Sequence, residues 1–160
     1  MNDTRVQRLI DERDVEQVFV RYFDRVDAGD PGTAALLFTE DVAAEIMTGK
    51  VYRGRDWYRR ALARTLAQYE RTSHHITNAR VEVDGDEALA VLYVYAFHRM
   101  AETGEPWHLW ARLVDRLRRT PEGWLIWDHR LYGVDGVPDR EAVPADFYQG
   151  HPGRGPASST

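Results

Sequence analysis

Several polar side chains in this sequence fall where predicted helices and strands would turn them toward an interior. They are Tyr22, Asp27, His74 or His75, His98 and Arg130. Aspartate, histidine and arginine are costly to bury without partners. An aspartate that accepts a hydrogen bond from one imidazole nitrogen fixes the tautomer and raises the basicity of the other nitrogen. Such a pair is a general base for taking a proton from carbon or water.

The other polar groups suit the second half of such a reaction. A tyrosine and a second histidine can polarise a carbonyl or protonate a leaving hydroxyl, and an arginine can hold a developing oxyanion. The adjacent residues His74 and His75 cannot act as a pair, because neighbours on a strand point to opposite faces. The sequence has no His-x-His or His-x-x-x-His pair, so no metal site is expected. It also has no phosphate-binding glycine loop or dinucleotide fingerprint, so no cofactor is expected.

The elements that must position these groups follow from hydrophobic periodicity. Helical spacing predicts helices over residues 11–28, 30–41 and 54–70, with Gly29 suited to cap the first. A strand or hairpin broken at Thr48-Gly49 is expected over 41–54. Apolar runs separated by turns predict four further strands, over 74–83, 88–100, 107–119 and 124–133. This order predicts an α+β domain, with N-terminal helices on one face of a curved antiparallel sheet. Together they form a cone whose mouth is a natural ligand site.

Length and composition set further limits. The 160 residues predict one domain, 1–132, and a Pro- and Gly-rich tail, 133–160, in which Phe147 and Tyr148 suggest a lid. A net charge of -5 argues against nucleic acid and anionic membranes as partners. The absence of cysteine excludes disulfides and a thiol nucleophile. With no apolar leader and no membrane-spanning run, the expected location is the cytoplasm. Three helices cannot cover both sheet faces, so a homodimer or homotrimer is expected.

Four stretches together resemble a known family. They read YFDRVDAGD, RTSHHITN, VDGDEALA and WARLVDRLRRTPEGW. Their order and spacing are similar to those of the SnoaL-like branch of the nuclear transport factor 2-like superfamily, over most of residues 10–132. That branch includes dehydratases such as scytalone dehydratase and bile-acid 7α-dehydratase, and a dehydrochlorinase. The resemblance implies the same cone-shaped fold and a small-molecule substrate.

The resemblance also implies roles for single residues. In these enzymes an aspartate after the first helix pairs with a histidine that follows a Thr-x motif, and the pair abstracts a proton. Carried over, the pair is Asp27 and His74, so that His75 points outward. A tyrosine five residues before the aspartate matches Tyr22. A second polar position on the next strand matches His98.

The substrate-binding residues carried over are less closely matched. Arg130 falls near an arginine in the last strand of the dehydrochlorinase, and Trp57 and Trp110 are the aromatic candidates for the substrate site. The strand tryptophans also suit a core or an interface. Val26 occupies the position of a pocket tyrosine in scytalone dehydratase, so the same substrate is not implied.

The function expected from this site is a cofactor-independent lyase, a dehydratase that removes a proton next to a carbonyl. Its substrate would be an apolar hydroxylated molecule of polyketide or steroid type. An isomerase or a polyketide cyclase could use the same base, because all three reactions begin with an enolate. The alternatives of another class are a non-catalytic ligand-binding module and a small subunit of a ring-hydroxylating dioxygenase. In a structural interpretation, Asp27 is only a turn residue and His74 a satisfied core histidine.

Overall fold

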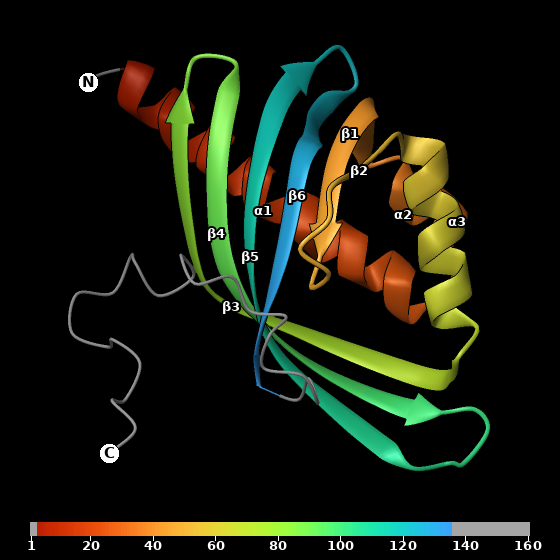
Figure 1. Ribbon diagram of the computed structural model, residues 1–160. Helices are drawn as coiled ribbons and strands as arrows, with labels where there is room; N and C mark the ends of the chain where they lie inside the picture. Colours follow the sequence, from red (N-terminus) through yellow and green to blue (C-terminus); the bar gives the residue numbers. More distant parts are fainter. Residues whose placement is uncertain (1–2, 136–160) are drawn as a thin grey trace, which may run out of the picture.

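The structure of the protein, a computed structural model, describes residues 3–135 (Figure 1). The helices within this range are α1 (Asp3–Asp27), α2 (Pro31–Ala35) and α3 (Arg55–Leu66). The strands are β1 (Phe38–Ile46), β2 (Tyr52–Arg53), β3 (Tyr69–Asp84), β4 (Glu87–Met100), β5 (Pro106–Thr120) and β6 (Gly123–Asp135). No helix in this range is both long and apolar enough to cross a membrane.

The strands form one curved sheet in the order β2-β1-β6-β5-β4-β3. Strands β3 to β6 are the antiparallel meander that the sequence predicts, so the α+β fold class is confirmed. The segment 41–54 supplies β1 and β2, and β1 also pairs in parallel with β6. This parallel pairing extends the meander to six strands. The second helix is shorter than predicted, because the chain enters β1 at Phe38.

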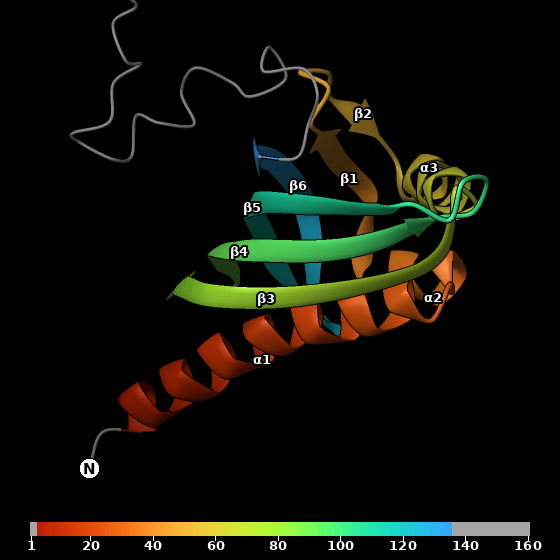
Figure 2. The same ribbon diagram turned by 90° about the horizontal axis from the view of Figure 1, so that it is seen from below.

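Helix α1 lies across the concave side of the sheet, which bends around it (Figures 1 and 2). Its buried apolar residues recur at helical spacing and include Val15, Val18, Phe19, Tyr22, Phe23 and Val26. The helix ends where Gly29 adopts a φ of +69°. The Gly29 amide donates to the carbonyl of Val26, and the next amide donates to the carbonyl of Arg25. This Schellman-type cap, at the glycine chosen from the sequence, leaves Asp27 in the last helical turn.

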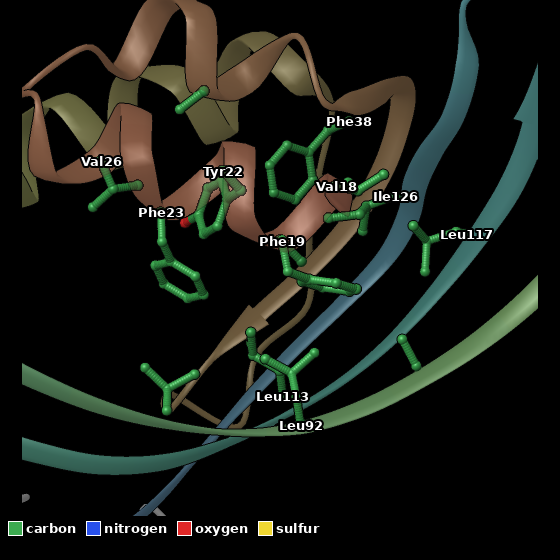
Figure 3. Packing of buried hydrophobic residues seen from close by; sticks show 14 of the residues in the cluster. Val18, Phe19, Tyr22, Phe23, Val26, Phe38, Leu92, Leu113, Leu117 and Ile126 are labelled. Atoms are coloured by element: carbon green, nitrogen blue, oxygen red, sulfur yellow. The ribbon is translucent and has the colours of Figure 1, made fainter. Parts of the chain in front are cut away.

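The hydrophobic core fills the space between α1 and the sheet (Figure 3). Strands β4 and β5 alternate between buried and less buried positions, and Leu92 and Leu113 are among the residues that face the helix. Phe38 from β1 and Tyr58 from α3 close the same core, and both are 1% exposed or less. Burial of each such side chain contributes about 1.5–3 kcal/mol. The core thus holds α1, α3 and the sheet together around the site described below.

Strand β6 continues through Asp135. The first residues of the segment 133–160, which the sequence analysis assigned to a tail, therefore belong to the sheet. Phe147 and Tyr148, with the lid suggested for them, lie outside the described residues.

Candidate active site

A cavity of about 150 Å³ lies between α1, α3 and the concave face of the sheet. Most of its wall is apolar and comes from Phe23, Val26, Ile46, Met47, Ala61, Leu62, Leu66, Val94, Leu109, Leu113 and Leu131. The ionisable groups that line it are Tyr22, Tyr58, Tyr69, His74, His98 and His129. The polar groups are thus few and stand in an apolar surrounding, which is the usual composition of a small-molecule site.

The structure brings Asp27 and His74 together at this cavity. Oδ1 of Asp27 lies 2.6 Å from Nδ1 of His74, and Oδ2 accepts a hydrogen bond of 2.8 Å from the His74 backbone amide. The Thr72 hydroxyl donates to Oδ1 at 2.8 Å. The His74 ring stacks on Phe23, with centroids 4.8 Å apart. The end of α1 is therefore tied to the start of β3 through a carboxylate that holds one imidazole in a single orientation.

The electrostatics of this pair favour a charged aspartate. Partial burial acts to raise the pKa of Asp27, but the hydrogen bonds from the His74 side chain and backbone and from Thr72 outweigh it, and the pKa lies below its ordinary value. A carboxylate can only accept hydrogen bonds, so Nδ1 of His74 carries the proton and Nε2 is the basic nitrogen. Since Nδ1 is turned toward Asp27 and the ring lines the cavity, Nε2 is the nitrogen available to a ligand.

The neighbouring histidine has a different environment. His75 is exposed, and its contacts are with Ser73 on its own strand and with the ring of Tyr95 on β4. It does not line the cavity. The alternation of strand β3 thus separates the two histidines as expected, with His74 inside and His75 outside.

The rings of His98 and His74 meet in a T-shaped contact, with their centroids 5.4 Å apart. The His98 side chain is 5% exposed and packs between Tyr69 and Trp107. Burial and the nearby His74 imidazole lower the pKa of His98 to about 4. His98 is therefore a neutral imidazole near neutral pH, suited to forming a hydrogen bond with a ligand rather than to holding a charge.

Arg130, expected at the substrate, does not line the cavity, and this expectation is corrected. Strand β6 contains one extra residue, Trp127, because successive residues of β5 pair with Ile126 and Asp128. Such a bulge reverses which residues face the interior. His129 is therefore the inward residue, and Arg130 points away and pairs with Asp128 at 2.5 Å.

The two tryptophans assigned to substrate binding also lie outside the cavity. Trp57 packs flat on Tyr52, with ring centroids 4.3 Å apart. Trp110 occupies the face of β5 opposite to the buried Leu109 and is 48% exposed. Trp57 contacts Tyr52, Trp110 contacts Tyr95, and neither ring lines the cavity.

Three buried residues near the cavity were missed from the sequence: Tyr58, Asp115 and His129. Tyr58 lies in the helix predicted over 54–70, and its hydroxyl lies 2.6 Å from that of Tyr22. Asp115 has the same parity along β5 as the buried Leu113 and Leu117, and a charge at such a position is a detectable signal. His129 has no such signal, because its inward direction depends on the bulge. Within residues 3–135, no group of three or more His, Asp or Glu side chains is arranged to hold a metal ion.

Comparisons with known proteins identify the family of the chain and agree with its fold. The family model described as the SnoaL-like domain matches residues 7–130. A structure from Novosphingobium aromaticivorans, provisionally named a scytalone dehydratase, is 26% identical, with a TM-score of 0.79 over 90% of this chain and 97% of that one. A provisionally named dehydratase of the NTF2-like family from Streptomyces avermitilis is 22% identical, with a TM-score of 0.74 over 79% and 98%.

A third similar structure is the hexachlorocyclohexane dehydrochlorinase LinA-type3 from Novosphingobium barchaimii. It is 16% identical, with a TM-score of 0.74 over 85% of this chain and 94% of that one. The last two likenesses, below 25% identity, show the fold alone. None of the curated proteins matches the chain.

Proposed function

The chain belongs to the SnoaL-like domain family, and we propose that it is a lyase of the dehydratase type. In this proposal its own side chains, without a cofactor, remove a proton next to the carbonyl of a small, largely apolar hydroxylated molecule. Loss of the hydroxyl from the neighbouring carbon then yields a conjugated double bond. Proximity of a base and a proton donor in a dry cavity is a recognised basis for such catalysis.

One observation carries the proposal: the hydrogen bond of 2.6 Å between Asp27 and His74 at the wall of an apolar cavity. The carboxylate holds the proton on Nδ1, so the imidazole has its lone pair on Nε2, and it stabilises the imidazolium that forms when that nitrogen takes a proton. The neutral His98 supplies a hydrogen-bonding group beside the same ring. The likeness to a provisionally named scytalone dehydratase supports the same reaction class.

The experiment measures the proton transfer directly. Cyclic β-hydroxy ketones are incubated with the protein in D₂O, and deuterium at the carbon next to the carbonyl is followed by mass spectrometry together with the unsaturated product. We expect His74→Ala to slow both by about 10²–10⁴-fold, the usual contribution of a general base. His75→Ala is the matched control, because it removes the adjacent imidazole from the outer face, and it should retain the wild-type rate.

The products also separate the alternatives. Deuterium uptake with a shifted double bond or a closed ring would indicate an isomerase or a cyclase that uses the same base. Binding of the ketones with neither deuterium uptake nor an unsaturated product would reject proton abstraction and leave a ligand-binding module.

A further inference from the structure

A second set of polar groups extends from the cavity into the core. The hydroxyl oxygens of Tyr22 and Tyr58 lie 2.6 Å apart, and the Tyr58 hydroxyl lies 3.4 Å from Nε2 of His129. Nδ1 of His129 lies 2.7 Å from Oδ2 of Asp115, whose Oδ1 accepts the Arg130 backbone amide at 3.0 Å. The four side chains form a continuous chain of polar atoms in the order Tyr22, Tyr58, His129, Asp115.

This chain is buried throughout. Asp115 is fully buried, and the exposed fractions are 1% for Tyr58, 2% for His129 and 6% for Tyr22. Burying such groups costs free energy unless each is hydrogen-bonded, and apolar residues of similar size would fill the same space without that cost. Tyr22, Tyr58 and His129 also line the cavity, so the chain begins at the ligand and ends at a buried carboxylate. This placement points to a role that packing does not require.

The tyrosines can act as proton donors. Burial raises the pKa of Tyr22 and of Tyr58 well above the ordinary value, so both phenols keep their protons near neutral pH. A phenol that holds its proton donates a hydrogen bond and can pass a proton on when another proton arrives from behind.

The donor and acceptor roles along this chain of side chains depend on how many protons His129 carries. With a neutral His129, the ring donates to Asp115 from Nδ1, Tyr58 donates to Nε2 and Tyr22 donates to Tyr58, so the Tyr22 oxygen offers only lone pairs to the cavity. When one proton is added at His129, Nε2 donates to Tyr58, Tyr58 donates to Tyr22, and the Tyr22 hydroxyl is free to donate to a ligand. One proton on the buried imidazole therefore reverses the two hydrogen bonds that link His129, Tyr58 and Tyr22, while Nδ1 still donates to Asp115.

We propose that Tyr22, Tyr58, His129 and Asp115 deliver the proton that the leaving hydroxyl requires. The inference rests on the proposed dehydratase function. His74 takes the proton from carbon, the electron pair of that C–H bond becomes the new carbon–carbon π bond, and the C–O bond breaks. The departing hydroxide takes the proton of Tyr22 and leaves as water. Tyr22 recovers a proton from Tyr58, and Tyr58 recovers one from His129, whose imidazolium is held beside Asp115. The proton gained by His74 returns to solvent, and His129 is reprotonated.

Tyr22 and His74 both line the cavity, and α1 carries both Tyr22 and Asp27, the partner of His74. Tyr22 and Asp27 are five residues apart, which corresponds to about 7.5 Å along a helix axis. Tyr22 and Phe23 both project from this helix toward the sheet (Figure 3), and Phe23 stacks on the base. In this arrangement Tyr22 is the catalytic acid, and Tyr58, His129 and Asp115 act through it as positioning residues.

The test separates proton removal from hydroxyl departure. Tyr58→Phe keeps the aromatic ring but removes the oxygen atom that links Tyr22 to His129 by hydrogen bonds. Deuterium uptake, dehydration of a β-hydroxy ketone and elimination from the matching β-chloro ketone, whose leaving group needs no proton, are measured in the same preparations. We expect the ratio of dehydration to deuterium uptake to fall by about 10²-fold, within the range of general acid catalysis. Chloride elimination should follow deuterium uptake. His74→Ala, the control, should lower all three rates together.

The outcomes distinguish the two proposals. If the wild-type protein forms no unsaturated product and takes up no deuterium, the dehydratase proposal itself fails. If both are observed, and Tyr58→Phe lowers dehydration, chloride elimination and deuterium uptake by one common factor, or lowers none of them, the proton-delivery chain is rejected alone. Should Tyr58→Phe not fold, His129→Gln gives the same comparison, because its amide can hydrogen-bond to Tyr58 but cannot carry an added proton.

Discussion

Replacing Asp27 by asparagine should move the proton of His74 from one ring nitrogen to the other while leaving the fold intact. The carboxylate now accepts three hydrogen bonds, from Thr72, from the His74 backbone amide and from Nδ1 of His74. An asparagine that keeps its oxygen on the backbone amide must turn its NH₂ group toward Nδ1 and the Thr72 hydroxyl. Both atoms can accept, but only if the imidazole proton shifts to Nε2. The basic nitrogen would then face the asparagine instead of the cavity.

The loss of stability should be limited because no group loses its partner. Charge-assisted hydrogen bonds of about 1.5–3 kcal/mol become neutral ones of about 0.5–1.5 kcal/mol. The Asp27 side chain is 28% exposed, which weakens the difference. Removing a negative charge from the C-terminal end of α1 returns about 0.3–1 kcal/mol. The three differences sum to about 3 kcal/mol, from which exposure and the helix end subtract, so the free energy of unfolding should fall by about 1–3 kcal/mol and Tm by about 2–12 °C.

The effect on proton abstraction should be much larger, about 10²–10⁴-fold. Nitrogen-15 NMR of the His74 ring reports the tautomer without any substrate, and deuterium uptake by a β-hydroxy ketone reports the rate. Asp30→Asn is the matched control, since Asp30 caps α2 through Thr33 and asparagine caps equally well. If Asp27→Asn keeps its proton on Nδ1, or keeps the wild-type rate, then the carboxylate does not orient the base and the reasoning is refuted.

Two further predictions concern stability and assembly. His98 is neutral in the folded state, with a pKa of about 4 against an ordinary 6.5, so its stabilising contribution is complete above pH 6.5 and is lost as the pH falls to 4. At 1.36 kcal/mol per pH unit this amounts to about 3 kcal/mol, and denaturant unfolding of His98→Gln should lack this component. Trp110, 48% exposed beside Tyr95, should lie in a contact between copies of the chain. Light scattering should show a dimer or trimer at micromolar concentration and a smaller species for Trp110→Arg.

Much of the fold could be predicted because the sequence patterns agree with the structure locally. The helical spacing from Val15 to Val26 identifies the buried face of α1, and Gly29 identifies its end. Alternation along β4 and β5 identifies the face that meets the helix. The pairing of β1 with β6 could not be predicted, because a parallel neighbour far along the chain leaves no local pattern in either strand.

The candidate site was predictable only where strand alternation is regular. His74 and His98 fall on the inner face because β3 pairs with β4 without a register shift from Arg71 to Thr77. In β6 the extra residue Trp127 turns His129 inward in place of Arg130. A bulge of one residue depends on how the neighbouring strand pairs, so the sequence of β6 alone does not contain it. His129 was therefore missed as a cavity residue, whereas Asp27 and His74 were expected to meet and are hydrogen-bonded at the cavity.

The size of the cavity restricts which part of a substrate can react. Its volume of about 150 Å³ matches that of an engineered apolar cavity, about 150 Å³, which binds benzene. The cavity, which is partly open, thus has room for one six-membered ring with small substituents. A polyketide or steroid of several fused rings would place one ring inside and the others outside. His74 and Tyr22 both line the cavity. In the proposed dehydration, the ring inside it must therefore carry both the acidic C–H bond and the leaving hydroxyl. Selectivity should then follow the shape of that ring against Leu109 and Leu113, with little dependence on the remainder of the molecule.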